Sequence, residues 1–320
     1  MKAPTMPKAP KPIPRDMTYH EARRFSLKVR VHGEEHDARI ILQSELPDLP
    51  EYDHDPDFDN VVGVHLDLSN VPICRLDEIE GLDEFPRLDI LRLDNTGLES
   101  LAGLDEMPWA SGLKELHAMQ NRLVQIEGLS CCASIERLFI GDYIEEIKGL
   151  ENCLLLKELQ ISGNITKIQN LSLPKLEILD LSNNYILKLE FPEVLVNLRM
   201  LYLHNNSIPR IENLDGLQSL QYIDLSNNQI RRIENLDRLD QLQQIILINN
   251  PIEGTDRLFK LVKENPLNVE DALNPAVARA HYIQLFKLSG IDISPHVLKR
   301  MENVEGKETL DIELIDYLKL

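Results

Sequence analysis

The chain has 320 residues, of which 43% are apolar, and its 34 Lys and Arg against 53 Asp and Glu give a formal net charge of -19 at pH 7. The apolar content is enough to bury a sizeable core and excludes a wholly disordered chain. The acidic excess argues against a nucleic-acid partner, because phosphate contacts need Lys and Arg.

The first 60 residues precede any leucine pattern. Residues 1–18 contain five prolines and predict a flexible tail. Residues 19–60 form an N-terminal flank, in which 25–42 is apolar at alternate positions on either side of a His-Gly-Glu-Glu turn and predicts a β-hairpin. The stretch 45–60 carries seven acids and three prolines, which is typical of a solvated linker.

The N-terminal composition also bears on location. The basic, proline-rich start has no apolar segment behind it, and no run of 18 apolar residues occurs, so we expect neither a secretory signal nor a membrane span. We predict a cytoplasmic protein, with a nuclear or axonemal location as the alternative.

Residues 61–253 repeat one leucine pattern. The segment 176–189 reads LEILDLSNNYILKL, and 198–211 and 220–233 repeat it as LRMLYLHNNSIPRI and LQYIDLSNNQIRRI. Nine copies occur at intervals of 20 to 25 residues, marked by Leu66, Leu91, Leu116, Leu138, Leu159, Leu179, Leu201, Ile223 and Ile245. The L-x-L core predicts a short strand whose leucines face inward. Because one repeat cannot bury its own leucines, we predict an α/β solenoid of stacked turns with a parallel, concave sheet.

The asparagine after each strand is predicted to be structural. After the strand the chain turns through the interior, where backbone donors and acceptors need partners. A buried Asn side chain offers both kinds of atom and can join neighbouring turns. The predicted ladder comprises Asn121, Asn164, Asn184, Asn206, Asn228 and Asn250.

After the repeats, the apolar spacing becomes helical, and residues 254–320 predict a C-terminal helical cap. One helix is expected over 256–265. Asn-Pro and Ser-Pro start signals predict helices over 276–290 and 296–303, and 309–320 has the pattern of a last amphipathic helix.

The 22-residue period, with I-E-N-L-x-x-L after the asparagine, resembles the leucine-rich-repeat subclass typified by the regulatory subunit of type-1 protein phosphatase. Similar repeats occur in an axonemal dynein light chain and in tubulin cofactors. The resemblance covers about 61–253 and is closest over 176–253, although the compact terminal cap of that family is not recognisable after 249–251. It implies a leucine-rich-repeat fold and a protein partner.

Catalytic and metal-binding patterns are weak. His32 and His36 are separated by Gly-Glu-Glu in a predicted turn, so they are not placed like the two ligands of a helical zinc motif. The alternating aspartates of 53–59 begin like a calcium loop, but Phe58 and Val64 stand at its required Gly and Glu positions. No phosphate-binding glycine loop or nucleophile elbow occurs. We therefore predict a protein that is not an enzyme and has no cofactor and no metal site.

The outward-facing strand positions are the candidate binding surface. They carry seven acids, Asp67, Asp94, Glu115, Asp142, Glu158, Asp180 and Asp224, opposed by Arg92 and Arg137. Such a face would steer a basic partner, although acidity also simply maintains solubility. Exposed apolar and aromatic residues on the same strands favour contact with a protein. The predicted partner-binding residues are Phe139, Ile178, Asp180, Met200, Tyr202, Tyr222 and Asp224.

These patterns predict a monomeric, non-enzymatic scaffold that binds a protein on its concave face, with no nucleic-acid or membrane partner. The resemblance implies two versions, a phosphatase regulatory subunit and a cilium, axoneme or microtubule-associated subunit. As an alternative, the repeats position a C-terminal helical module that binds a ligand or carries an activity.

Overall fold

The computed structural model describes residues 28–37, 39–42, 62–85, 87–264, 275–302 and 311–313. The predicted tail at 1–18 and the acidic stretch at 45–60 lie outside the described residues. The chain divides into two compact units, the first comprising 1–143 with 148–156 and the second 144–147 with 157–320. Within the described residues no helix is long and apolar enough to cross a bilayer.

The first unit contains the first four of the predicted repeat strands. β4 (Val62–Asp67), β6 (Ile90–Arg92), β7 (Glu115–Leu123) and β8 (Arg137–Ile144) pair in parallel, each with the next. Their register aligns the marker leucines Leu66, Leu91, Leu116 and Leu138, all of them fully buried. Among the described residues of this unit, short 3-10 helices complete the turns at Leu76–Glu78, Leu82–Glu84, Leu104–Glu106 and Ala110–Gly112.

The N-terminal hairpin is present, but it is shorter than predicted. β1 (Lys28–Val31) and β2 (Glu34–Asp37) pair antiparallel around a turn at His32 and Gly33, both of which have positive φ. β1 also pairs with β5 (Ile79–Glu80). The predicted return strand instead becomes β3 (Arg39–Leu42), which pairs antiparallel with β4. On the side of β4 away from β6, the backbone N–H and C=O groups need partners, and β3 supplies them.

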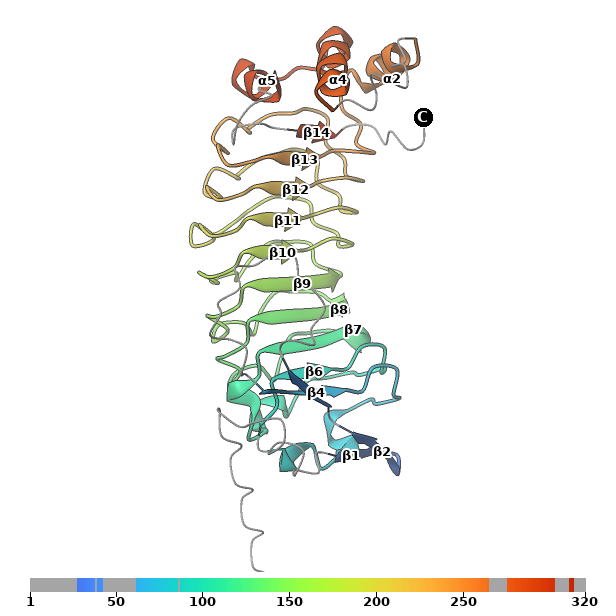
Figure 1. Cartoon of the computed structure of the whole chain (residues 1–320), viewed down its shortest axis with the longest axis vertical. Helices are drawn as coiled ribbons and strands as arrows, with labels where there is room; N and C mark the ends of the chain where they lie inside the picture. Colours follow the sequence, from blue (N-terminus) through green and yellow to red (C-terminus); the bar gives the residue numbers. More distant parts are fainter. Residues whose placement is uncertain are drawn as a thin grey trace, which may run out of the picture. The chain divides into compact units, whose positions relative to one another are not determined.

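The second unit holds the remaining repeat strands. β9 (Glu158–Gly163), β10 (Ile178–Asp180), β11 (Met200–Tyr202), β12 (Tyr222–Asp224) and β13 (Gln244–Ile246) lie one above another in parallel (Figure 1). In β10 to β13 the central residue is buried and both flanking residues are half-exposed. The strands therefore bury one face against the leucine core and present the other to solvent.

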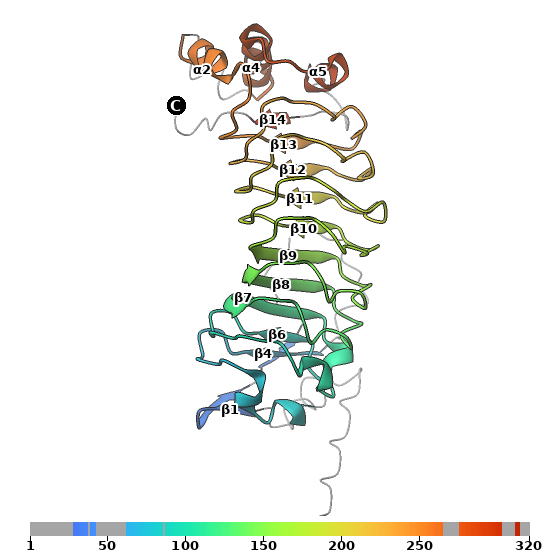
Figure 2. The same cartoon turned by 180° about the vertical axis from the view of Figure 1, so that it is seen from behind.

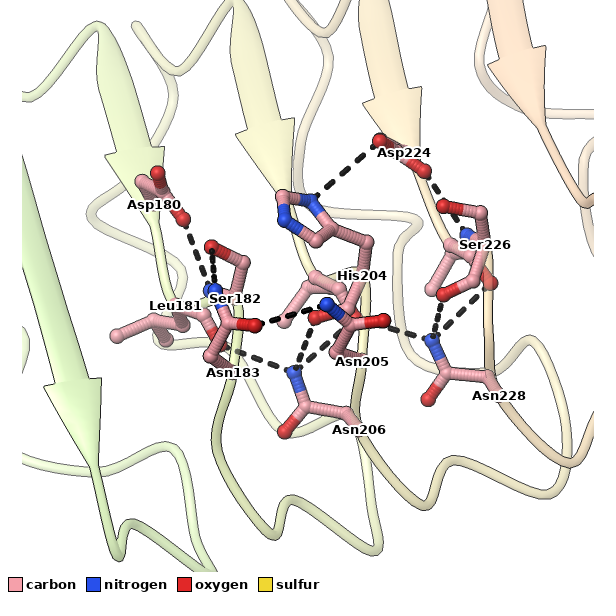
Figure 3. A network of polar contacts seen from close by, with 12 residues as sticks. Asp180, Leu181, Ser182, Asn183, His204, Asn205, Asn206, Asp224, Ser226 and Asn228 are labelled. Atoms are coloured by element: carbon pink, nitrogen blue, oxygen red, sulfur yellow. Dashed lines mark hydrogen bonds and ion pairs between the residues drawn. The ribbon is translucent and has the colours of Figure 1, made fainter.

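An asparagine closes each of the last turns. The side-chain nitrogen of Asn206 donates to the carbonyls of Leu181 (2.9 Å) and Leu203 (3.0 Å), and its oxygen accepts from the backbone N–H of Ile186 at 2.9 Å. Figure 3 shows the donor side of this arrangement for Asn206 and Asn228. Asn184 and Asn250 make equivalent bonds.

In the first unit an asparagine joins neighbouring turns in the same way, but its oxygen accepts from three backbone N–H groups. The oxygen of Asn121 accepts from the backbone N–H groups of Thr96, Gly97 and Leu98. Asn164, in the second unit, is only half-buried, and its backbone N–H donates to the carbonyl of Ile144 at 2.8 Å. In both units, polar turn atoms of one repeat are satisfied by the next.

Beyond the last repeat, the described part of the second unit contains helices (Figure 2). They are α2 (Thr255–Glu264), α4 (Pro275–Ser289) and α5 (Pro295–Glu302), close to the predicted bounds. The hydroxyl of Ser294 accepts from the backbone N–H of Val297 and caps α5, as the Ser-Pro signal predicts. Arg300 of α5 is buried and donates to the carbonyls of the turn at 239–242, which fixes α5 to the last repeat.

The predicted helix over 309–320 is wrong in its described part. Asp311–Glu313 form β14, which pairs in parallel with β13 and aligns Ile312 with Ile245. The edge of β13 would otherwise expose unpaired backbone groups, and an added strand satisfies them. This tertiary contact outweighs the helical apolar spacing of the segment.

Candidate functional site

Six of the predicted binding residues meet on the solvent side of β10, β11 and β12. The strand register sets them in two rows, which we name together the tyrosine face. One row is Ile178, Met200 and Tyr222, and the other is Asp180, Tyr202 and Asp224. All six are half-buried. Tyr202 thus lies between two carboxylates carried by the adjacent strands.

The two tyrosines contact each other across neighbouring strands. Their ring centroids lie 5.2 Å apart with the planes tilted by 46°. Such a pair stabilises the sheet, and it also presents a continuous aromatic surface to solvent. The geometry is compatible with both roles.

The aspartates are held by their own turns. One oxygen of Asp180 accepts from the backbone N–H of Ser182 at 2.8 Å, and one oxygen of Asp224 accepts from Ser226 at 2.9 Å (Figure 3). The second oxygen of Asp224 lies 3.4 Å from Nδ1 of His204, a contact that is long for a hydrogen bond and becomes an ion pair when the imidazole is protonated. No ion pair to Asp180 occurs among the described residues. Both carboxylates are therefore oriented, and that of Asp180 keeps an oxygen for another partner.

Phe139, the seventh predicted residue, belongs to the first unit. Its ring stacks on the imidazole of His117, with centroids 4.4 Å apart and planes inclined by 19°. Phe139 is half-buried on β8, so part of its surface is already covered within its own unit. We treat it separately from the tyrosine face.

Glu115, predicted as an outward-facing acid, is buried at the centre of a charge network. Its oxygens accept from Nε2 of His117 at 2.5 Å and from Nε of Arg137 at 2.6 Å, and the guanidinium of Arg92 lies 3.6 Å away. Burial alone would raise the pKa of Glu115, but the bond from His117 and the charge of Arg137 lower it to about 2. The negative charge of Glu115 is thus compensated by Arg92 and Arg137, and Glu115 does not steer a partner.

The neighbouring His65 was not singled out by the sequence patterns. Both of its ring nitrogens are buried and have no hydrogen-bond partner among the described residues. Burial lowers the pKa of His65, and the nearby Arg92 lowers it further. The pairing of β4 with β6 sets His65 opposite Ile90 and Asp67 opposite Arg92, so Arg92 is a diagonal neighbour of His65.

Cation-binding geometry is not found in the described part of the chain, where no group of three or more His, Cys, Asp or Glu side chains is placed to hold a metal ion. The aspartates at 53–59 lie outside the described residues. His32 instead contacts the carbonyl of Pro72 through Nε2 at 2.9 Å.

Comparison with known proteins identifies the repeats. A model of two leucine-rich-repeat copies matches residues 196–238, and a single leucine-rich repeat matches 175–196. No curated protein matches the sequence.

Solved structures share the architecture. An internalin, InlF of Listeria monocytogenes, has a TM-score of 0.53 at 20% identity, covering 79% of this chain and 67% of its own. Internalin C2 of the same organism has a TM-score of 0.50 at 24% identity, covering 57% of this chain and 80% of its own. The functional domain of InlJ, described as including a cysteine ladder, has a TM-score of 0.49 at 21% identity; the matched part spans 59% of this chain and 40% of that domain.

These matches establish the class of fold. The protein is a leucine-rich-repeat solenoid with a parallel sheet and a small C-terminal helical part. The closer resemblance to the 22-residue subclass stays a prediction, because identities of 20–24% show a shared fold alone.

Proposed function

We propose that the protein is a non-enzymatic interaction scaffold that binds a partner protein through the tyrosine face. The observation that supports this is the register of β10 to β12, which sets an apolar row beside a row in which Tyr202 lies between Asp180 and Asp224. Half-exposed aromatic rings bordered by polar groups are the composition of an interface centre.

The same arrangement favours a basic partner. A Lys or Arg side chain placed over Tyr202 or Tyr222 would gain a cation–π contact and reach an oriented carboxylate. The apolar row would then cover the aliphatic stem or a neighbouring apolar side chain. The net charge of -19 would speed the encounter with such a surface.

The C-terminal helices serve in this proposal as a cap. Arg300 ties α5 to the turn at 239–242 through three carbonyls, and β14 covers the edge of β13. These contacts favour a structural role over a separate ligand-binding or enzymatic module. We further propose that the protein is monomeric and cytoplasmic.

The test is capture of a partner by purified protein from an extract of the source cell. Wild type is compared with Tyr202→Ala/Tyr222→Ala and with Tyr185→Ala, an exposed tyrosine of the same unit outside the face. We expect the double variant to lose at least ~2 kcal/mol of binding free energy, about 30-fold in Kd, and Tyr185→Ala to bind normally. Unchanged binding by a folded double variant would refute the tyrosine face.

The identity of the captured protein separates the two versions that the resemblance implies. A phosphatase catalytic subunit would co-purify as a soluble binary complex. An axonemal or microtubule partner would make the protein sediment with polymerised tubulin. Circular dichroism of every variant confirms that the repeats are folded.

A further inference from the structure

A second surface runs along the edge of the second unit where the repeat strands begin. It is a groove of about 590 Å³ that passes the start of β9 to β13, and we name it the strand-start groove. Lys157, Glu177, Arg199 and Gln221, each the residue immediately before a strand, form one side. Residues two positions earlier in the repeat, including Lys175, Asn197 and Gln241, form the other. None of these residues belongs to the tyrosine face.

Backbone bonds between repeats fix the spacing of the first side. The N–H of Glu177 donates to the carbonyl of Lys157, the N–H of Arg199 to that of Glu177, and the N–H of Gln221 to that of Arg199, each at 2.8 Å. The side chains therefore start one strand spacing apart, about 4.8 Å. Over the four intervals from β9 to β13 the groove is ~19 Å long, which matches about six residues of extended chain at ~3.3 Å each.

The charge of the groove is opposite to that of the protein. Three cations, Lys157, Lys175 and Arg199, line it with the single carboxylate of Glu177, whereas the whole chain has a net charge of -19. Lys175 has no ion pair among the described residues, and the guanidinium of Arg199 makes one long contact of 3.4 Å with Gln221. At Lys175 and Arg199 the groove thus keeps positive charge that its other lining residues do not neutralise.

The end of the groove near β12 and β13 is uncharged and hydrogen-bonding. Gln221 and Gln241 line it, and Asn197, one repeat before Gln221, has its nitrogen bound to the carbonyl of Pro174 at 2.7 Å. Side-chain amides carry a donor and an acceptor, as a peptide backbone does. No aromatic ring is among the lining residues, so the groove lacks the flat apolar platform that stacks bases.

We propose that the strand-start groove binds an extended acidic peptide segment of a partner. Carboxylates of the segment pair with Lys157, Lys175 and Arg199, and its backbone bonds to the amides near β12 and β13. Because the cations lie on three successive repeats with Glu177 among them, they fit charges spread along a chain and do not converge on one small anion. A nucleic acid is disfavoured because the lining offers no aromatic ring on which a base could stack.

The test uses a fluorescein-labelled eight-residue peptide of alternating glycine and glutamate and measures its binding to the full chain by fluorescence anisotropy. The groove variant is Lys175→Glu/Arg199→Glu. The matched control is Lys167→Glu/Arg210→Glu, which makes the same charge change at two exposed cations of the same unit outside the groove. We expect the groove variant to bind at least 10-fold more weakly and the control to change less than 3-fold.

Further variants make the outcome specific. Glu177→Gln should strengthen binding several-fold because it removes the one repelling carboxylate, and Tyr202→Ala/Tyr222→Ala should leave it unchanged. If charge reversal unfolds the chain, Lys175→Gln/Arg199→Gln takes its place. Equal losses in groove and control variants would overturn the proposal. So would equal binding of a glycine–lysine peptide, or tighter binding of polyphosphate or single-stranded DNA that depends on Lys175 and Arg199.

Discussion

The side-chain nitrogen of Asn205 donates a hydrogen bond to the side-chain oxygen of Asn183, 2.8 Å away and one repeat earlier (Figure 3). Asn249 and Asn227 repeat this pair at 2.7 Å, and in the first unit Asn95 and Asn70 do so at 2.8 Å. All six have φ between 53° and 65°. Pairs of exposed asparagines therefore accompany the buried asparagines, at positions where the chain has left-handed backbone.

Asn205 is predicted to stabilise the fold in two separable ways. Asn205→Gly should lose only the side-chain bond to Asn183, because glycine adopts the left-handed region freely, and should cost about 0.5–1.5 kcal/mol. Asn205→Ala should cost ~1–2 kcal/mol more, because alanine also pays for the positive φ. Urea unfolding of both variants measures the difference. Equal stability of the two would contradict the backbone part of the argument.

The buried asparagine beside it should be more costly to replace. Asn206→Leu keeps the number and branching of the side-chain atoms but leaves the N–H of Ile186 without its side-chain partner. It also removes one of the two side-chain donors from the carbonyls of Leu181 and Leu203, which keep their bonds from Asn184 and Asn228. We expect a loss of about 2–4 kcal/mol in the free energy of unfolding, from one unsatisfied buried donor and two lost hydrogen bonds. Ser207, the next residue in the chain, is half-exposed and offers a control. Ser207→Ala should cost less than ~0.5 kcal/mol. An Asn206→Leu variant as stable as wild type would show that water can satisfy the backbone groups that Asn206 bonds.

Periodicity predicts most of the fold, because the buried leucines and the turn asparagines recur in the sequence itself. All nine marker residues lie in described strands. The pattern failed at β14, where pairing with β13 outweighed helical spacing, and at β3, which pairs with β4 instead of with β1. Both errors concern strand edges, whose partners depend on contacts far away in the chain.

Part of the candidate surfaces was also predictable, because the repeat pattern determines which strand residues face outward. The alternation of inward and outward residues predicts that Tyr202 and Tyr222 are at the surface, and the register makes them neighbours. It cannot predict that Glu115 is buried under Arg92 and Arg137, because side-chain reach across strands decides this. The strand-start groove likewise depends on residues outside the L-x-L core, where the repeat consensus says nothing.

The Glu115 network predicts a pH dependence in the first unit. The folded pKa of Glu115, about 2, lies below its ordinary value of 4.5, so the ionised carboxylate stabilises the folded state. This contribution is complete above pH 4.5 and is lost as the pH falls toward 2. Glu115→Gln should therefore be ~2–3 kcal/mol less stable than wild type at pH 7, and the difference should shrink in acid. Denaturant unfolding between pH 7 and 2.5 measures it; a constant difference would contradict the predicted linkage.

The four cysteines should separate into two classes of reactivity. Cys74 and Cys131 are exposed, whereas Cys132 and Cys153 are fully buried, and burial raises the pKa of Cys132 to about 12 and of Cys153 to about 11. A thiol-specific reagent at pH 8 should label two groups at once in the folded protein and all four in denaturant. Cys131→Ser should remove one fast-reacting group. Rapid labelling of three or four thiols would show that the repeat around Cys132 opens.

Gly128 and Gly103 provide a matched test of close packing between repeats of the first unit. Both have positive φ, 72° and 89°, so alanine at either position pays a similar backbone cost. A Cβ on Gly128 would lie 2.1 Å from the carbonyl oxygen of Leu101, whereas one on Gly103 would meet nothing within 4 Å. Gly103→Ala should thus cost about 1–2 kcal/mol, and Gly128→Ala clearly more, because the turn at Leu101 must also move. Thermal unfolding of the two variants gives the comparison. Equal losses would mean that the spacing between these turns is set by backbone conformation alone and that the absence of a side chain at Gly128 is not what allows the close approach.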